Sequence, residues 1–171
     1  MNANEIPLNA ATRLGRIKTA SRILRVLIGV SIVIGAPYSF AVYFGWLPPL
    51  PAGSKILISP HQLYSSPSEI PTAVFALALV RLGLAVFCSV VLYNLFRLYE
   101  RGILFSARNV RYIRFLGWYL MIDWVVIYQL ESLSHAMDLS FTQPFIGLMI
   151  IFVAWIMDEG RKIQEEQALT V

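Results

Sequence analysis

Two charged residues stand inside segments that are otherwise apolar, and charges in such places can do chemistry within a membrane. Arg81 lies in the apolar run 73–96, and Asp123 lies in the apolar run 115–130. A charge in hydrocarbon is costly, so such residues usually face the interior of a helix bundle, where they pair or line a polar path. The two residues therefore predict either an ion or ligand pathway or a structural ion pair.

The heights of these charges above the basic ends of their helices indicate which of them pair. Arg81 is 16 residues before Arg97, which places it about 24 Å up at the rise of an α-helix. Asp123 and Glu131 are 9 and 17 residues past Arg114, which places them about 14 Å and 26 Å up by the same rise. This measure predicts that Arg81 pairs with Glu131. It leaves Asp123 for a functional role, or for hydrogen bonds to Ser or Tyr.

Four apolar runs must position these charges. A bilayer core about 30 Å thick is crossed by about 20 helical residues, and the chain is 57% hydrophobic and 14% charged, with a mean hydropathy of +0.65. We therefore predict an all-α fold, a four-helix transmembrane bundle that forms a single integral membrane domain. The predicted spans are approximately 23–47, 72–97, 110–131 and 140–158, followed by a tail at 159–171.

The positions of the basic residues predict the orientation in the membrane. Of the 14 Lys and Arg residues, 12 precede the first apolar run (26–47), lie between the second (73–96) and the third (115–130), or follow the fourth (139–157). Cytoplasmic loops carry the excess of Lys and Arg, so both termini are predicted to be cytoplasmic. The same placement explains the net charge of +4 by topology and by contact with the lipid bilayer. It argues against direct binding of nucleic acid.

Local patterns predict how parts of the chain pack. Ser31, Gly35 and Ser39 repeat every four residues and form a small-residue face, which predicts close approach of a second helix. Pro37 predicts a kink in the same helix. The apolar stretch 56–58 predicts a strand-like segment or one resting on the membrane, within an outer loop long enough to pack over the bundle.

No pattern of catalytic or metal-binding residues appears in the sequence. His61 and His135 both fall in outer loops, and Cys88 is the single cysteine. No phosphate loop, paired-cysteine motif or dinucleotide fingerprint is present. We therefore predict no enzymatic activity, no metal and no cofactor.

The inner turn and the tail resemble a known family. The segments Glu-Arg-Gly-Ile-Leu-Phe-Ser at 100–106 and Glu-Gly-Arg-Lys-Ile-Gln at 159–164 resemble domain-of-unknown-function family 2975, a group of small four-helix membrane proteins of bacteria. The resemblance covers roughly residues 20–171 and implies location in the bacterial inner (cytoplasmic) membrane. Its relatives are often encoded beside a short helix-turn-helix DNA-binding protein, which implies a role in regulation and a small cytoplasmic helix-turn-helix regulator as a partner.

The polar tail is the second candidate site. Its acidic and apolar groups are Glu165, Glu166, Leu169 and Val171. They predict either a docking peptide for a cytoplasmic partner or a solvated helix folded back on the basic inner turn.

The sequence leaves three functions open. We favour a regulatory or sensory membrane protein that acts through a cytoplasmic protein partner. The alternative is a small transporter or channel subunit that uses Arg81 and Asp123. A third hypothesis is a structural membrane protein without a ligand. The oligomeric state stays open, and a homo-oligomer is one of the alternatives.

Overall fold

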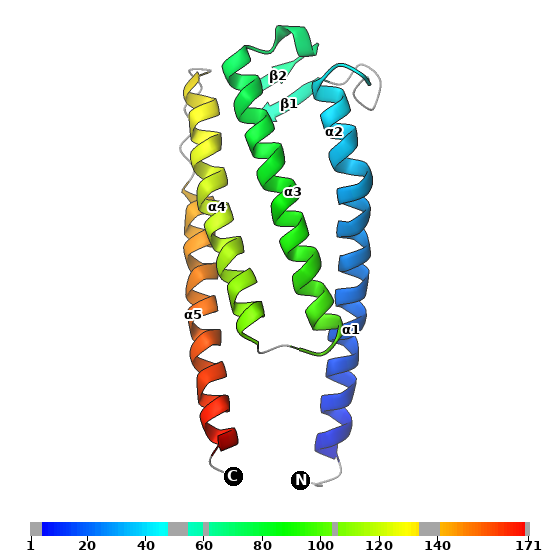
Figure 1. The fold of residues 1–171 in the computed structure, drawn as a ribbon, viewed down its shortest axis with the longest axis vertical. Helices are drawn as coiled ribbons and strands as arrows, with labels where there is room; N and C mark the ends of the chain where they lie inside the picture. The colour runs from blue at the N-terminus through cyan, green and yellow to red at the C-terminus, as the bar shows by residue number, and fades with distance from the viewer. Residues whose placement is uncertain (1–4, 48–54, 60–61, 104–105, 134–140, 170–171) are drawn as a thin grey trace.

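The structure, a computed structural model, describes residues 5–47, 55–59, 62–103, 106–133 and 141–169, and Figure 1 shows its long helices side by side. The helical elements are α1 (Glu5–Val30), a π-helical stretch (Ser31–Gly35), α2 (Ala36–Tyr43), α3 (Thr72–Glu100), α4 (Ala107–Leu133) and α5 (Thr142–Leu169). Among the described residues, four segments are long and apolar enough to cross a membrane: Gly15–Tyr43, Thr72–Glu100, Ala107–Leu130 and Thr142–Gln167. The predicted all-α, four-helix transmembrane fold is confirmed.

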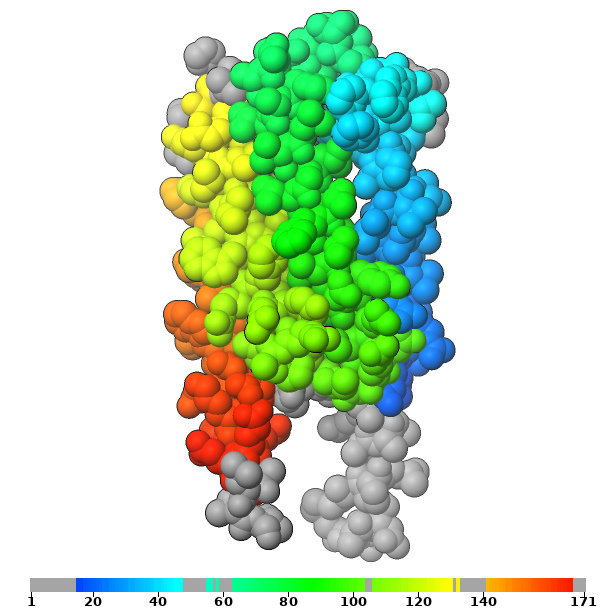
Figure 2. All heavy atoms as spheres, in the orientation of Figure 1, coloured from blue at the N-terminus to red at the C-terminus, as the bar shows by residue number. Residues whose placement is uncertain are grey.

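The first and last helices are longer than the spans predicted from hydropathy. The helix that contains the first span begins at Glu5, and α5 continues without a break to Leu169. Both ends of the chain lie at the same end of the bundle (Figure 1). In Figure 2 the last turns of α5 extend beyond the ends of α3 and α4, so the tail is an extension of a spanning helix.

The main helix contacts join neighbours along the chain. The first span packs against α3, α3 packs against α4, and α4 packs most extensively against α5. Each helix is thereby positioned by the one before it. The apolar side chains that face outward along these helices suit a lipid environment, in which exposed apolar surface carries no penalty.

A short hairpin closes the end of the bundle away from the termini. Strand β1 (Ile56–Ser59) pairs antiparallel with β2 (Gln62–Tyr64). The side chains of Ile56 and Ile58 are 4% and 2% exposed. They pack in one cluster with Val42, Ile70, Val74, Ala78 and Leu130. The prediction of a strand-like segment in a loop that packs over the bundle is therefore confirmed.

Local chemistry explains how the inner turn and the first span are shaped. Gly102 has a φ of +78°, a conformation in which a side chain would be strained. Ser106 Oγ accepts a hydrogen bond from the backbone N–H of Asn109 at 3.2 Å and caps the start of α4. In the first span, the π-helical stretch Ser31–Gly35 ends two residues before Pro37. The distortion expected of a proline inside a helix takes this form.

Candidate functional site

Arg81 joins three elements of the fold. Its Nε donates a hydrogen bond to Asp123 Oδ1 on α4 at 3.3 Å, and its Nη1 donates one to the carbonyl oxygen of Ile58 in β1 at 2.7 Å. The guanidinium is therefore shared between α4 and the hairpin of β1 and β2. Because the hairpin supplies a backbone carbonyl and buried isoleucines at this point, it partly shields the ion pair from water.

Asp123 is the buried centre of the site. Its side chain is 8% exposed, against 33% for that of Arg81. Its second carboxylate oxygen, Oδ2, accepts a hydrogen bond from Gln143 Nε2 on α5 at 2.8 Å. Each carboxylate oxygen thus has a donor from a different helix, which is how a buried charge is made tolerable. The contacts link β1, α3, α4 and α5 through four residues.

Arg81 pairs with Asp123, so the prediction that leaves Asp123 without this cation is wrong, whereas the predicted pairing of Arg81 with Glu131 falls on a side chain outside the described residues. Glu131 lies near the end of α4, and its side chain is outside the part of the chain that the structure describes. Of the two alternatives for these charges, the contacts of Asp123 match the structural ion pair.

The error came from the choice of reference points for depth. Arg97 and Arg114 are not equivalent reference points, because α3 continues three residues beyond Arg97, to Glu100, whereas α4 begins seven residues before Arg114, at Ala107. Measured from Glu100, Arg81 is 19 residues up the helix, or about 28 Å. Measured from Ala107, Asp123 and Glu131 are 16 and 24 residues up, or about 24 Å and 36 Å. The long, flexible arginine side chain spans the small remaining difference.

A glycine contact sets the register that brings Gln143 to Asp123. A Cβ added to Gly117 on α4 would lie 2.7 Å from the carbonyl oxygen of Gly147 on α5 and 2.6 Å from Ile151 Cγ1. Only glycine permits backbones to approach this closely. The two glycines thereby fix α4 and α5 side by side, and the polar contact forms further along the same pair of helices.

The predicted close approach at the small-residue face of the first span is not what the structure shows. A Cβ added to Gly35 would meet only Ser31 Oγ, at 3.5 Å and within its own helix. The hydroxyl of Ser39 donates a hydrogen bond to the carbonyl oxygen of Gly35 at 2.9 Å, so this hydrogen bond also stays within the same helical segment. Gly117 and Gly147 were missed because each lacks a small residue four positions away.

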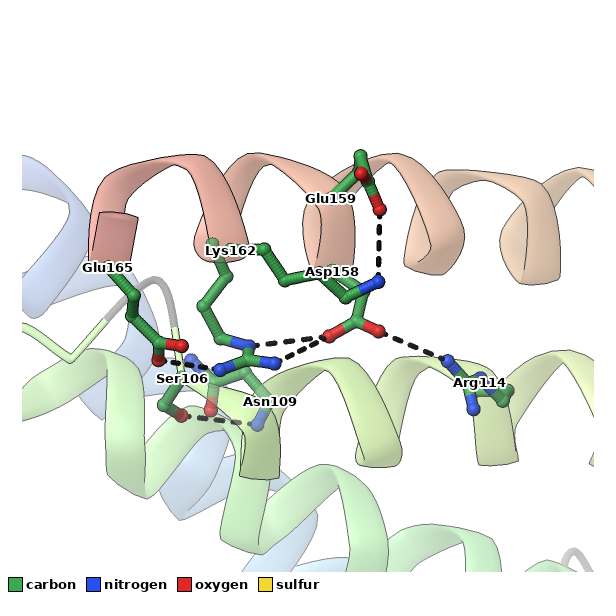
Figure 3. A network of polar contacts seen from close by, with 8 residues as sticks. Ser106, Asn109, Arg114, Asp158, Glu159, Lys162 and Glu165 are labelled. Atoms are coloured by element: carbon green, nitrogen blue, oxygen red, sulfur yellow. Dashed lines mark hydrogen bonds and ion pairs between the residues drawn. The ribbon is translucent and has the colours of Figure 1, made fainter. Parts of the chain in front are cut away.

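The base of the tail is held by charges on α4 and α5, as Figure 3 shows. Asp158 accepts hydrogen bonds from Arg161, 3.2 Å from its Nη2, and lies 3.9 Å from Arg114 Nη2 on α4. Arg161 also pairs with Glu165 one turn further on, as its spacing predicts. Beyond these contacts the polar side chains of α5 are exposed.

The tail candidates lie on an extended helix. Glu165 and Glu166 are exposed on α5, and Leu169 is the last residue of that helix, with its side chain outside the described part. Val171 also lies outside the described residues. The described part of the tail continues along the axis of α5 and does not fold back on the inner turn (Figure 1). This arrangement leaves the acidic side chains accessible to a partner.

Among the described residues, no group of three or more His, Cys, Asp or Glu side chains is close enough to hold a metal ion. His61 and His135 lie outside those residues.

Comparison with known proteins identifies a family but no activity. The family model described as "Protein of unknown function (DUF2975)" matches residues 57–171, which include the hairpin from its second residue on, α3, α4, α5 and every residue of the polar network. No curated protein matches the chain, and no solved structure matches it. The functional argument therefore depends on the geometry of the site.

Proposed function

Because this chain belongs to the family of proteins of unknown function DUF2975, we propose its function from the site itself: it is a regulatory or sensory membrane protein. In this proposal a change at the outer hairpin alters the presentation of the tail to a cytoplasmic partner. The membrane is the bacterial inner membrane, and the end that carries both termini faces the cytoplasm. The basic residues at that end support this orientation.

One observation carries the proposal, namely that a continuous chain of contacts connects the hairpin to α5. The contacts run from the Ile58 carbonyl to Arg81, from Arg81 to Asp123, and from Asp123 to Gln143. Gln143 stands in the first turn of α5, and the tail is the far end of the same helix. A displacement of the hairpin therefore reaches the helix that displays the tail.

The length and continuity of α5 make it suitable for transmission. Gln143 and Glu165 are 22 residues apart, which corresponds to about 33 Å along a helix. A packed helix moves as a rigid element with discrete arrangements, so a small shift at one end appears at the other. The close contact of Gly117 with Gly147 is the natural pivot between the two ends.

The exposed tail offers the surface for the partner. Glu165 and Glu166 present acidic groups, and the apolar side chains of Leu169 and Val171 follow them in the sequence. A helical segment with both kinds of group suits docking into a groove on a basic protein. The resemblance to the family points to a small cytoplasmic helix-turn-helix regulator as that partner.

The contacts do not favour the transporter alternative. Arg81 and Asp123 bind each other, and Gln143 occupies the second carboxylate oxygen. A transport site needs groups that can exchange partners with a substrate or ion. The paired arrangement instead couples the elements that it joins.

Capture of the partner from membranes tests the proposal. The wild-type protein, a Glu165→Gln/Glu166→Gln variant and an Arg81→Leu variant are produced at equal levels, cross-linked and purified. We expect one small basic protein to be captured by wild type and lost from the tail variant. Its amount should change at least severalfold in the Arg81→Leu variant. The proposal would be overturned if the partner were captured in equal amounts by the wild-type protein, the tail variant and the Arg81→Leu variant.

A further inference from the structure

The seam between the first span and α3 contains a cavity whose lining is polar at one end and apolar along the rest. Its volume is about 370 Å³. Arg25 and Tyr93 mark the polar end, where the guanidinium lies 5.9 Å from the centre of the tyrosine ring. The remaining lining residues are Val26, Gly29, Val30, Val33 and Ile34. Such a lining matches a molecule with a charged head and an aliphatic chain.

The length of the cavity matches one leaflet of a bilayer. Arg25 and Ile34 are nine residues apart, which corresponds to about 13 Å along the helix. Half of a hydrocarbon core about 30 Å thick is about 15 Å. Arg25 lies level with the end of α3 because it pairs with Glu100, the last residue of that helix. The polar end is therefore at the membrane boundary, and the apolar part extends to about the bilayer centre.

The polar end carries a surplus of positive charge. Arg22 and Arg25 both pair with the single carboxylate of Glu100, with Arg22 Nε at 3.0 Å. The Arg22 side chain remains 70% exposed. Lys18, one turn earlier on α1, lies close to Gly102 of the inner turn. Two arginines share one carboxylate and a lysine lies nearby, so an unneutralised positive charge remains beside the cavity and attracts an anionic group.

Glycine creates the space. A Cβ added to Gly29 would lie 3.6 Å from the Tyr93 ring, in ordinary van der Waals contact, so the absence of a side chain leaves the aliphatic wall of the seam open. The neighbouring side chains Val33 and Ile34 are exposed. In a bilayer an apolar gap of this kind loses dispersion contacts unless an acyl chain fills it.

We propose that this cavity binds one anionic phospholipid from the leaflet at the end of the bundle that carries both termini. The phosphate sits at Arg22 and Arg25, and one acyl chain lies along α1 from Val26 to Ile34. A second copy of this chain is a poorer occupant, because its own Lys18, Arg22 and Arg25 would approach the same cations. A zwitterionic lipid has no net negative charge, so the surplus positive charge at Arg22 and Arg25 attracts it less strongly than an anionic lipid.

Native mass spectrometry of the purified full-length protein tests the head-group half of the proposal. The protein is titrated with phosphatidylglycerol, with phosphatidylcholine of the same chains, and with inorganic phosphate. We expect one phosphatidylglycerol to be retained per chain in preference to phosphatidylcholine. Arg22→Gln should weaken its binding about fivefold, the effect of one basic residue near a membrane surface. Glu100→Gln should strengthen binding, because it removes the competing carboxylate, and Arg108→Gln, an exposed control on α4, should leave binding unchanged.

Two glycine substitutions test the acyl-chain half. Gly29→Leu fills the cavity and should abolish the preference for phosphatidylglycerol. Gly83→Leu fills a neighbouring cavity of about 450 Å³ between the same helices and should preserve that preference. The melting temperature of each variant shows whether it is folded. If Gly29→Leu does not fold, the result for Arg22→Gln decides between binding and its absence. The proposal would be overturned if the two lipids were retained equally, or if inorganic phosphate bound as well in the absence of lipid. Equal effects of the two glycine changes on the lipid preference would also overturn it.

Discussion

Arg81 on α3 donates a hydrogen bond to Asp123 on α4 across 3.3 Å, in a site that the outer hairpin covers through the carbonyl of Ile58. A buried ion pair adds little net stability, because the loss of hydration offsets the attraction. It does fix the relative positions of the elements that it joins. We therefore interpret this pair as the link through which a displacement of the hairpin reaches α4 and α5.

A double-mutant cycle tests the pair. Arg81→Leu leaves the Asp123 carboxylate without its cation, and Asp123→Asn leaves the guanidinium without its anion, so each change should destabilise the detergent-solubilised protein by about 1–3 kcal/mol. The double variant should recover much of that loss. Glu131→Gln serves as the control and should show no coupling with Arg81→Leu. Additive losses for Arg81 and Asp123 would contradict the pairing.

The amide of Gln143 can be tested by adding a charge. Gln143→Glu places a second carboxylate beside Asp123 Oδ2, where the amide now donates at 2.8 Å, and like charges at a buried site destabilise it. We expect a lower melting temperature than that of the wild-type protein. Gln164→Glu, on the exposed tail of the same helix, should leave the melting temperature unchanged. A comparable loss in both variants would argue against the contact.

The glycine contact between α4 and α5 should be intolerant of any side chain. Gly117→Ala places a methyl group against the Gly147 carbonyl and Ile151, which should cost about 1–3 kcal/mol by overpacking. Gly35→Leu is the matched control in the first span, where an added Cβ meets only its own helix. It should keep a melting temperature near that of wild type. The reverse order of the two effects would show that the small-residue face of the first span is the tighter contact.

Reporter fusions test the orientation in the membrane. Fusions at Ser54 and Ser134 should report the outside, and fusions at Ser106 and Val171 should report the cytoplasm, because 12 of the 14 basic residues fall on one side of the membrane. Paired reporters active on opposite sides of the membrane provide the control. A cytoplasmic signal at Ser54 would reject the predicted orientation.

Features encoded locally could be predicted from the sequence. The length of the apolar runs identified the four spans, and the apolar stretch at 56–58 identified β1. The i to i+4 spacing of Arg161 and Glu165 identified their ion pair. Each of these depends on residues close together in the chain.

Features that depend on how helices align could not be predicted in the same way. The partner of Arg81 depends on where α3 ends and α4 begins relative to each other, and hydropathy does not define helix ends closely enough. The contact of Gly117 with Gly147 depends on the register of two helices, and a lone glycine in each gives no periodic signal. The contact of the Gln143 amide with Asp123 was not predicted, because Gln143 is only the fourth residue of the predicted span 140–158 and its depth was not compared with that of Asp123.

A distance between the start of α4 and the tail of α5 tests the central claim that the polar network couples the hairpin to the tail. Spin labels at Arg108 on α4 and Gln164 on the tail, in a Cys88→Ala background and in nanodiscs, report the position of α5 by pulsed electron resonance. Arg81→Leu, far from both labels, should shift the distance distribution by about 1–2 Å or broaden it, as helix shifts in switching proteins do. Superimposable distributions for the two proteins, with the variant folded, would contradict the account.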